Sequence, residues 1–398
     1  MRPMDAYDVD SLPGSRSGDR VVAEAWYDGA LVAGDLPVVS WRLDWDRSRQ
    51  VQCQGQVQIV DADGVLDPWA VDDPLNVGGA TVRLTWVFAS GGEVALGEYR
   101  ITQSSPAQQY VMKRIVTGYD DQGLPIYEDE GRWLRAGVQV TLNIDDLTWN
   151  VKTADFLGPE TVQHTSSVLA EVDRLCEDLI DIDPREDVQD ASVPSAITYE
   201  GDRMDAIGSL LRSIDAEGRM TGDGVMEIIP SAEGDPVWVA AGGEEGVLID
   251  FGRTYSAGDL VNTVVVEGRR EDDDRPLIGV ARETTGPLRT DGPHGLVPAY
   301  RQADILNTQV KVDRAAETHL REVAAARSIV LPVTCLPHPG LQVSDVVRVV
   351  TPEGDLVGPV QSMSLSGSDG AVHPMSIGVS VPMEAVQNIG VALRGSTA

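Results

Sequence analysis

Apolar and polar residues alternate along most of residues 20–156, which is the period-two pattern of half-buried β-strands. The segment VVSWRLDW places Trp41, Leu43 and Trp45 on one face, and ATVRLTWVF and VQVTLNIDD alternate in the same way. Tight-turn sequences such as Tyr27-Asp28-Gly29 lie between these segments. Many short alternating strands of this kind favour a closed or nearly closed antiparallel barrel.

One strand has an unusual polar face. The segment QVQCQGQVQI has glutamine at every even position, at Gln50, Gln52, Gln54, Gln56 and Gln58, and apolar or small residues at the odd positions. Because successive side chains of a strand point to opposite faces, we expect one face in a core and one face of uncharged amides. Charged residues make up 24% of the chain, so a solvated strand face would be expected to carry Lys, Glu or Thr instead.

The apolar period changes from 2 to 3.6 after residue 156. The segments TSSVLAEVDRLCEDLI and DRMDAIGSLLRSIDAE each predict an amphipathic helix, the first with an N-cap within residues 165–167. The second is expected to stop at Gly218 and to run into the hairpin RMTGDGVMEIIP, which turns at Asp223-Gly224. Helices and a hairpin together predict a small α+β domain.

Strands resume at about Val247 and, with one helix at DRAAETHLREVAAAR and a long irregular stretch, continue to the end of the chain. The predicted fold is mainly β with an α+β insert, in which two antiparallel β-barrel domains flank the small α+β domain. The expected organisation is a flexible N-terminal arm over residues 1–19, a first barrel over 20–156, the α+β domain over 157–246 and a second barrel over 247–398.

Composition narrows the possible functions. The net charge is −32, which argues against nucleic-acid binding through phosphates and against binding to anionic membrane surfaces. The opening residues are polar, and no apolar run approaches the ~20 residues that a membrane span needs. We therefore expect the protein to be made and folded in a cytoplasm.

The sequence offers little chemistry. Cys53, Cys176 and Cys335 are far apart and lie among apolar residues, which favours reduced, buried thiols. The five histidines have no zinc-site spacing, and nucleophile elbows and phosphate-binding loops are absent. The segment DADGVLD at 61–67 lacks the calcium-loop register, so a turn capped by Asp side chains is favoured. We expect no metal, no cofactor and no enzymatic activity.

The order of the segments resembles the tail-hub family of tailed bacteriophages, the baseplate-hub-like minor tail proteins. DRSRQVQCQGQVQIVDADGVLDPW, LNVGGATVRLTW and ALGEYRIT are similar to the strands of the first hub barrel, and VQVTLNIDDLTWNVKTADF to the strand that closes it. LVNTVVVEGR, GPLRTDGPHGLVPAY, DRAAETHLREVAAAR and LQVSDVVRVV resemble the second barrel with its crossover, helix and final meander. The resemblance covers roughly residues 20–385, and it depends on order and spacing because each motif is weak by itself.

This resemblance implies two tail-hub-type barrels per chain and a homotrimer, whose six barrels form a pseudo-hexameric ring between a sixfold tail tube and a threefold tail tip. The implied partners are the distal tail protein or tube end, the tape-measure protein and tail-tip or fibre proteins. DNA would pass through the ring without specific binding. The implied location is the tail tip of the virion, after assembly in the host cytoplasm. As a departure from the family, we expect no lysozyme, peptidase or fibre-like extension after the second barrel.

Such a ring gives the glutamine face a role. Charged residues at a contact between barrels would be desolvated at a cost of several kcal/mol each, whereas amides can exchange hydrogen bonds across it. The hypothesis is that Gln50, Gln52, Gln54, Gln56 and Gln58 face another subunit or the tube; the alternative is an ordinary solvated strand face.

Other functions stay open at this stage. Trp41, Trp45 and Trp86 are in phase with apolar faces, so core packing is expected of them. A carbohydrate-binding module of a tail tip would instead use Trp69, Trp133 and Trp238 as exposed stacking platforms. A cell-wall hydrolase and a hub of a phage-derived injection system are further alternatives.

Overall fold

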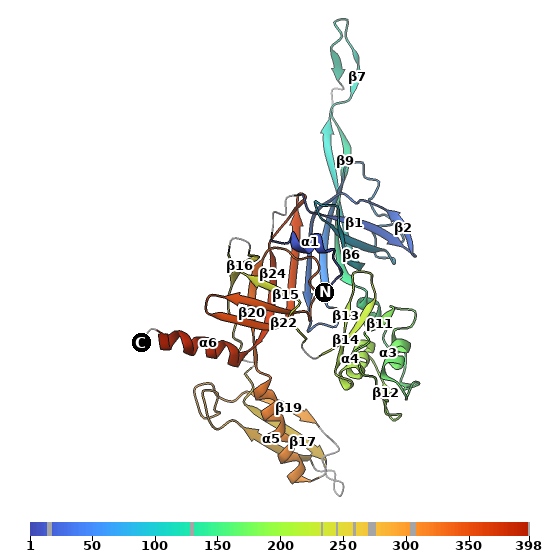
Figure 1. Ribbon diagram of the computed structural model, residues 1–398. Coiled ribbons are helices and arrows are strands. Elements are labelled where there is room, and N and C mark those ends of the chain that lie inside the picture. The colour runs from blue at the N-terminus through green and yellow to red at the C-terminus, as the bar shows by residue number, and fades with distance from the viewer. Residues whose placement is uncertain are drawn as a thin grey trace. The chain divides into compact units, whose positions relative to one another are not determined.

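Figure 1 shows the computed structural model of the chain. It describes residues 1–13, 18–127, 131–231, 234–243, 246–257, 260–269, 276–302 and 308–396. The chain forms two compact units. Unit 1 comprises Met1–Asp250, Val333–Arg348 and Pro359–Gly378, and unit 2 comprises Phe251–Pro332, Val349–Gly358 and Val379–Ala398. The residues that the sequence assigns to a second barrel therefore contribute to both units.

A large antiparallel sheet dominates unit 1. Its neighbouring strands run in the order β22-β3-β4-β9-β6-β5-β1-β2. Their bounds are β1 Arg20–Tyr27, β2 Ala30–Ala33, β3 Val38–Asp46, β4 Cys53–Asp61, β5 Thr81–Val87, β6 Glu93–Lys113, β9 Arg132–Asp146 and β22 Gly354–Ser368. β22 enters unit 1 at Pro359 and pairs with β3 from Ser362 to Ser368.

The alternation read from the sequence places the expected side chains in the core of unit 1. Trp41, Trp45 and Trp86 are buried. The rings of Trp41 and Trp86 meet in a T-shaped, edge-to-face arrangement with centroids 6.4 Å apart. Leu43 and Val57 on neighbouring strands are fully buried beside them. The prediction that these tryptophans pack in the core is confirmed, and the geometry is the one that aromatic quadrupoles prefer.

The N-terminal segment is anchored in unit 1. Arg2 is buried and donates hydrogen bonds to the carbonyl oxygens of Pro339, Leu341 and Leu96, at 2.8–3.0 Å. A short helix, α1, follows at Ala6–Asp10. The sequence predicts a flexible arm over residues 1–19, and this prediction needs correction at Arg2. A buried guanidinium has lost its water, so it must keep its carbonyl partners, and this holds the chain in place around Arg2. Residues 14–17 of the arm lie outside the described residues.

The α+β insert in unit 1 contains α2 Thr148–Thr153, β10 Glu160–Thr161, α3 Val168–Cys176, β11 Ile182–Pro184, β12 Thr198–Tyr199, α4 Arg203–Ser213, β13 Ala216–Met220 and β14 Met226–Pro230. Ser167 caps α3 by accepting from the Ala170 amide, and Asp202 caps α4 by accepting from the Asp205 amide. Both helices bury the apolar stripe that the sequence predicts. The predicted hairpin is present as β13 and β14.

Unit 2 has its own small core. β17 Thr263–Arg269 pairs antiparallel with β18 Pro276–Arg282 and parallel with β19 Pro298–Gln302, and α5 Gln309–Ala325 packs on this sheet.

The helices and strands not yet named are distributed over the two units. They are β7 Val116–Tyr119, β8 Pro125–Tyr127, β15 Trp238–Ala241, β16 Leu248–Phe251, β20 Ser328–Cys335, β21 Val346–Thr351, β23 Ala371–Val372, β24 Met375–Pro382 and α6 Met383–Ser396.

The fold is thus mainly β with large antiparallel sheets and an α+β insert, as the sequence predicts. Within the part of the chain that the structure describes, no helix is both long and apolar enough to cross a bilayer.

Candidate assembly surface

The glutamine segment forms β4 in the predicted orientation. Cys53, Val57 and Ile59 are buried, whereas Gln54 and Gln56 are exposed and Gln58 is half-buried. Gln56 Nε2 donates to Asn143 Oδ1 on β9 at 3.2 Å, and Gln58 Oε1 accepts from Ser40 Oγ on β3 at 3.2 Å. The amides therefore bond sideways to neighbouring strands and keep part of their hydrogen-bonding capacity for solvent or another molecule.

Gly55 holds β4 close to its neighbours. A Cβ atom at this position would lie 2.6 Å from Leu43 Cδ2 and 2.7 Å from the Arg42 carbonyl oxygen. Since the second of these is a backbone atom, β3 would have to shift to admit a side chain. The glycine in the middle of the glutamine segment thus keeps β3 and β4 in register beneath the polar face.

The polar face extends over five strands of unit 1, which the register of the sheet shows directly. Three rows of paired residues cross β22, β3, β4, β9 and β6 in that order. The first row contains Ser364, Asp44, Gln54, Asp145 and Arg100, and the second contains Ser366, Arg42, Gln56, Asn143 and Gln103. The third row contains Ser368, Ser40, Gln58, Thr141 and Ser105. We call these fifteen residues the polar face. Amides and hydroxyls make up most of it.

The polar face is electrically balanced although the chain is strongly acidic. It contains two cations, Arg42 and Arg100, and two anions, Asp44 and Asp145, so its formal charge is zero against −32 for the chain. Arg42 Nε lies 2.7 Å from Asp44 Oδ2, and this hydrogen bond raises the pKa of Arg42. The polar face therefore contributes nothing to the net negative charge of the chain.

Gln50 and Gln52 find partners inside the chain. Gln50 Nε2 donates to Asp202 Oδ2 and Asp205 Oδ1 at the start of α4, at 2.9 and 2.8 Å. Gln52 Nε2 donates to the Gly218 carbonyl oxygen at 3.0 Å. These two side chains line a cavity of about 280 Å³ beside α4. They hold the α+β insert against the sheet, so only Gln54, Gln56 and Gln58 of the five lie in the polar face.

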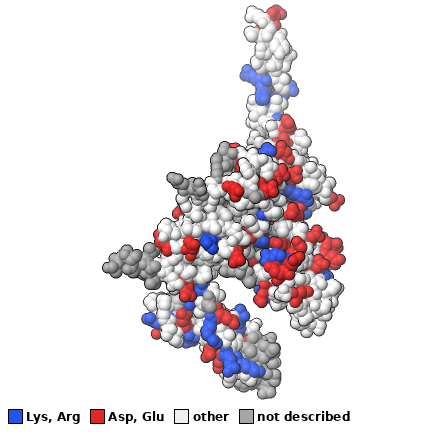
Figure 2. All heavy atoms as spheres, viewed as in Figure 1, with Lys and Arg blue, Asp and Glu red and all other residues white. Residues whose placement is uncertain are grey.

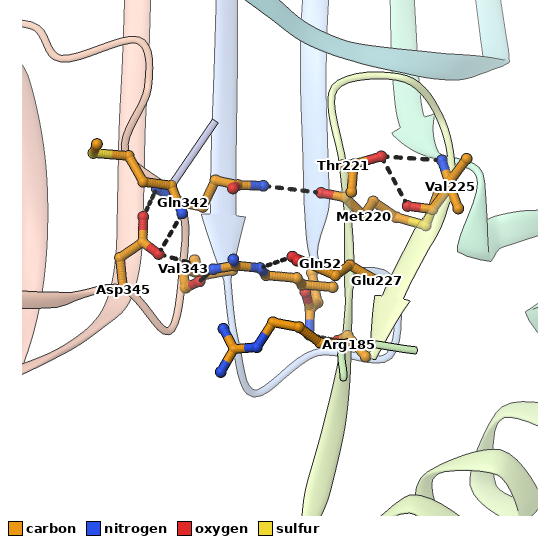
Figure 3. A network of polar contacts seen from close by, with 12 residues as sticks. Gln52, Arg185, Met220, Thr221, Val225, Glu227, Gln342, Val343 and Asp345 are labelled. Carbon is orange, nitrogen blue, oxygen red and sulfur yellow. Dashed lines mark hydrogen bonds and ion pairs between the residues drawn. The ribbon is translucent and has the colours of Figure 1, made fainter. Parts of the chain in front are cut away.

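A second polar network joins the insert to the loop before β21 (Figure 3). Arg219 is buried. Its Nη1 atom lies 2.9 Å from Asp345 Oδ1, and its Nε atom lies 2.8 Å from Glu227 Oε2. Asp345 Oδ2 also accepts from the backbone N–H of Gln342, and the side-chain Nε2 of Gln342 donates to the Met220 carbonyl oxygen. Two segments distant in sequence, the β13–β14 hairpin and the loop before β21, are thereby fixed around one guanidinium, which gives the sheet and insert a defined geometry.

Potentially reactive groups are held in inert surroundings. The three cysteines are free and buried, and burial raises the pKa of the Cys176 and Cys335 thiols to about 12. Burial also raises the pKa of Asp146 to about 6, even though Thr148 and the Cys53 amide donate to it. The prediction of reduced, buried thiols is confirmed.

The acidic turn after β4 caps itself. Asp61 accepts from the amides of Asp63 and Leu66 at 3.0 and 2.7 Å, as expected for an Asp-capped turn. Although burial opposes ionisation of Asp61, these backbone hydrogen bonds outweigh it and lower its pKa. Among the described residues, no group of three or more His, Cys, Asp or Glu side chains could hold a metal ion.

The three tryptophans considered for glycan stacking differ in exposure. Trp69 and Trp133 are 75% and 67% exposed. Trp238 is half-buried, and its ring meets that of His338 edge-on with centroids 5.0 Å apart. The prediction that Trp238 is exposed is therefore wrong, because its strand position next to His338 covers the ring.

Comparison with solved structures identifies the fold. The chain superimposes on the tail protein from Neisseria meningitidis MC58 with a TM-score of 0.58, at 12% identity, covering 91% of this chain and 96% of that one. The 43 kDa tail protein of prophage MuSo2 from Shewanella oneidensis gives 0.55 at 12% identity, covering 90% and 98%. This chain has the phage tail-protein fold. No protein-family profile matches the sequence, and no curated protein matches it.

The tail-protein fold agrees with the family resemblance drawn from the sequence. The extent of the polar face was not predicted, because it depends on a strand that follows β4 by some 300 positions. A signal for it exists in the segment QSMSLSGS, which has serine at every even position from Ser362 to Ser368 in the same way as the glutamines. Hydroxyls at alternate positions are common, however, and pairing between distant strands cannot be read from either segment alone.

Proposed function

We propose that this protein is a structural component of a phage tail, that three copies form its hub ring, and that the polar face is buried between neighbouring copies. The observation that carries the proposal is a neutral, five-strand face of amides and hydroxyls on a chain of charge −32 that has the tail-protein fold. Burying the amides and hydroxyls that make up most of this face costs far less than burying carboxylates, and they can satisfy one another across the contact. Of its four charged side chains, Arg42 and Asp44 already pair with each other.

In the proposed ring the chain works mechanically and electrostatically. The ring joins a sixfold tube to a threefold tip, with the distal tail protein, the tape-measure protein and tip or fibre proteins as partners. Its acidic surfaces repel the phosphates of DNA that passes through at ejection. No bond is made or broken by the protein in this role.

The test introduces charge into the polar face. Gln54→Glu with Gln56→Glu adds two exposed carboxylates that a contact would have to desolvate, so we expect the particle to dissociate toward the monomer in light scattering. The matched control is Gln163→Glu with Gln189→Glu, which adds the same charge at exposed positions of the α+β insert. An unchanged particle mass for the first variant, or a particle that is not a trimer, would refute the proposal.

Glycan recognition is the second candidate, and the exposure of Trp69 favours it. An exposed indole can stack on a sugar ring without any change in the fold. Binding on a glycan array that is lost in Trp69→Ala would support this function for the tail tip. Zymography on cell-wall material tests the remaining alternative of a hydrolase.

A further inference from the structure

The strands of the large sheet fall into two sets that repeat one pattern. The first set lies in the order β3-β4-β9-β6-β5-β1, and the second lies in the order β16-β20-β24-β22-β21-β15. When the strands of each set are numbered by their place in the chain, both orders read 2-3-6-5-4-1. The short strands β2 and β23 lie outside this pattern. The two sets therefore correspond strand by strand, with β22 in the place of β6 and β16 in the place of β3.

One pair of strands joins the two sets inside the chain. The later part of β22 pairs antiparallel with β3, from Ser362 to Ser368. Just before this part, Val360 donates to the Asp345 carbonyl oxygen and accepts from the Ser344 amide, in the loop before β21. Since β24 occupies the other edge of β22, the edge that faces β21 at first pairs with the first set after Val360.

β6 has the first half of this arrangement without the second. It pairs with β5 as far as Arg100, and the Ile101 amide donates to the Ala80 carbonyl oxygen. Over Gln103–Ser105, β9 occupies one edge of β6, and no described strand pairs with the other edge. Pro106 follows, and because proline has no N–H it would end a ladder at this point, as in other edge strands. β6 therefore has a free edge where its counterpart β22 pairs with β3.

β16 is the end strand of the sheet. Among the described strands it pairs with β20 alone, and beside it the Leu336 amide donates to the Val247 carbonyl oxygen. Ile249 is 55% exposed, and Asp250 is exposed as well. Its counterpart β3 has β4 on one edge and β22 on the other, so β16 lacks the second of these partners. An unpaired strand edge is a template for pairing with another chain.

The charge of these two edges permits such pairing. Acidic side chains are spread over the visible face of the molecule (Figure 2), so contacts elsewhere on this face bring carboxylates together. Residues 103–109 of β6 include no charged side chain, and β16 includes one, Asp250. A ladder between the two strands consists of backbone N–H and C=O groups, which need no charged partner.

We propose that the free edge of β6 in one copy pairs with β16 of a second copy, Gln103–Ser105 against Leu248–Asp250, in the way that β22 pairs with β3 inside the chain. The occupant is a second copy because each edge is the counterpart of one that this chain already pairs. The two edges differ, so the contact is head to tail and can close into a ring. The proposal rests on the proposed function and deepens it, since it names backbone edges that join the copies, separate from the polar face.

Cross-linking tests the contact, because the three native cysteines are buried. Chains with Ser105→Cys are co-expressed with chains with Ile249→Cys and treated with a short bis-maleimide, and we expect a covalent dimer of the two. Val32→Cys replaces Ile249→Cys as the control, since Val32 is 42% exposed on β2, the strand at the opposite end of the sheet. Equal yields from the two pairs, or a higher yield with Val32→Cys, would overturn the proposal.

Hydrogen exchange on the natural protein provides a second measurement that needs no substitution. We expect the amides of residues 103–105 and 248–250 to exchange roughly tenfold more slowly in the assembled particle than in the chain dissociated by dilution. The amides of β2 serve as the control and should exchange at the same rate in both. Unchanged exchange in the first two segments contradicts the strand contact.

The outcomes separate this contact from the hub. A trimer that gives neither the cross-link nor the slower exchange contradicts the strand contact and leaves the hub standing. A particle with the cross-link but a different number of copies supports the strand contact and contradicts the hub. A chain that stays monomeric and gives no cross-link contradicts both.

Discussion

Arg219 and Asp345 lie 126 positions apart in the sequence, yet their side chains form a buried ion pair with Arg219 Nη1 2.9 Å from Asp345 Oδ1. Both side chains are at most 6% exposed. Arg219 also donates to the Val343 carbonyl oxygen at 3.2 Å. The pair therefore fixes the α+β insert to the loop that precedes β21.

The first prediction concerns this pair. Arg219→Met removes the guanidinium from the buried Asp345, which keeps the N-terminal ammonium of Met1 at 2.8 Å from its Oδ1, so we expect a loss of about 1–3 kcal/mol in the free energy of unfolding. Urea denaturation measures it. Arg185→Gln is the control, because Arg185 pairs with Asp187 at the surface, where ion pairs contribute little. Equal stability of the two variants would show that the buried pair does not brace the insert.

The second prediction concerns pH. Burial raises the pKa of Asp146 to about 6 from an ordinary value of 3.8, so between these values the folded chain holds a proton that the unfolded chain has lost. The contribution of Asp146 to stability is thus largest at low pH and falls as the pH rises through about 6, by up to about 3 kcal/mol.

Asp146→Asn cannot titrate and isolates this effect. The unfolding free energy of the natural protein minus that of Asp146→Asn should fall between pH 4 and pH 7, as measured by denaturant titrations at matched ionic strength. Two parallel pH profiles would mean that Asp146 keeps an ordinary pKa in the folded state.

The third prediction concerns Gly55. Gly55→Ala brings a methyl group to within 2.7 Å of the Arg42 carbonyl oxygen, so β3 and β4 must separate, at a cost of about 1–3 kcal/mol. Thermal unfolding followed by circular dichroism measures the loss. At Gly158 no atom lies within 4 Å of a new Cβ, and Gly158→Ala should leave the melting temperature nearly unchanged.

The fourth prediction tests whether the polar face acts as one surface. Ser366 lies in the same row as Arg42 and Gln56, two strands away from the glutamine strand. If copies meet through this face, Ser366→Glu should lower the particle mass in the same direction as the paired glutamine substitutions. Sedimentation velocity distinguishes this result from dissociation confined to the glutamine strand, which would limit the contact to β4.

The sequence predicts the local elements of this protein well and its long-range pairing poorly. The period-two strands around Trp41 and Trp86 and the two helices of the insert are where the pattern places them, because each depends on residues within a few positions. The anchoring of Arg2 and the half-burial of Trp238 were missed, since both depend on residues 338–341, far along the chain. The sequence also groups Gln50 and Gln52 with the proposed contact between subunits, whereas in the structure both side chains donate hydrogen bonds to the α+β insert.

The path of the chain through the two units sets the order in which the protein can be completed. It crosses between them five times, after residues 250, 332, 348, 358 and 378. The serines of β22 that complete the polar face are added by the ribosome long after the glutamines of β4. A chain released before Ser362 is added would therefore lack the β22 edge of that face.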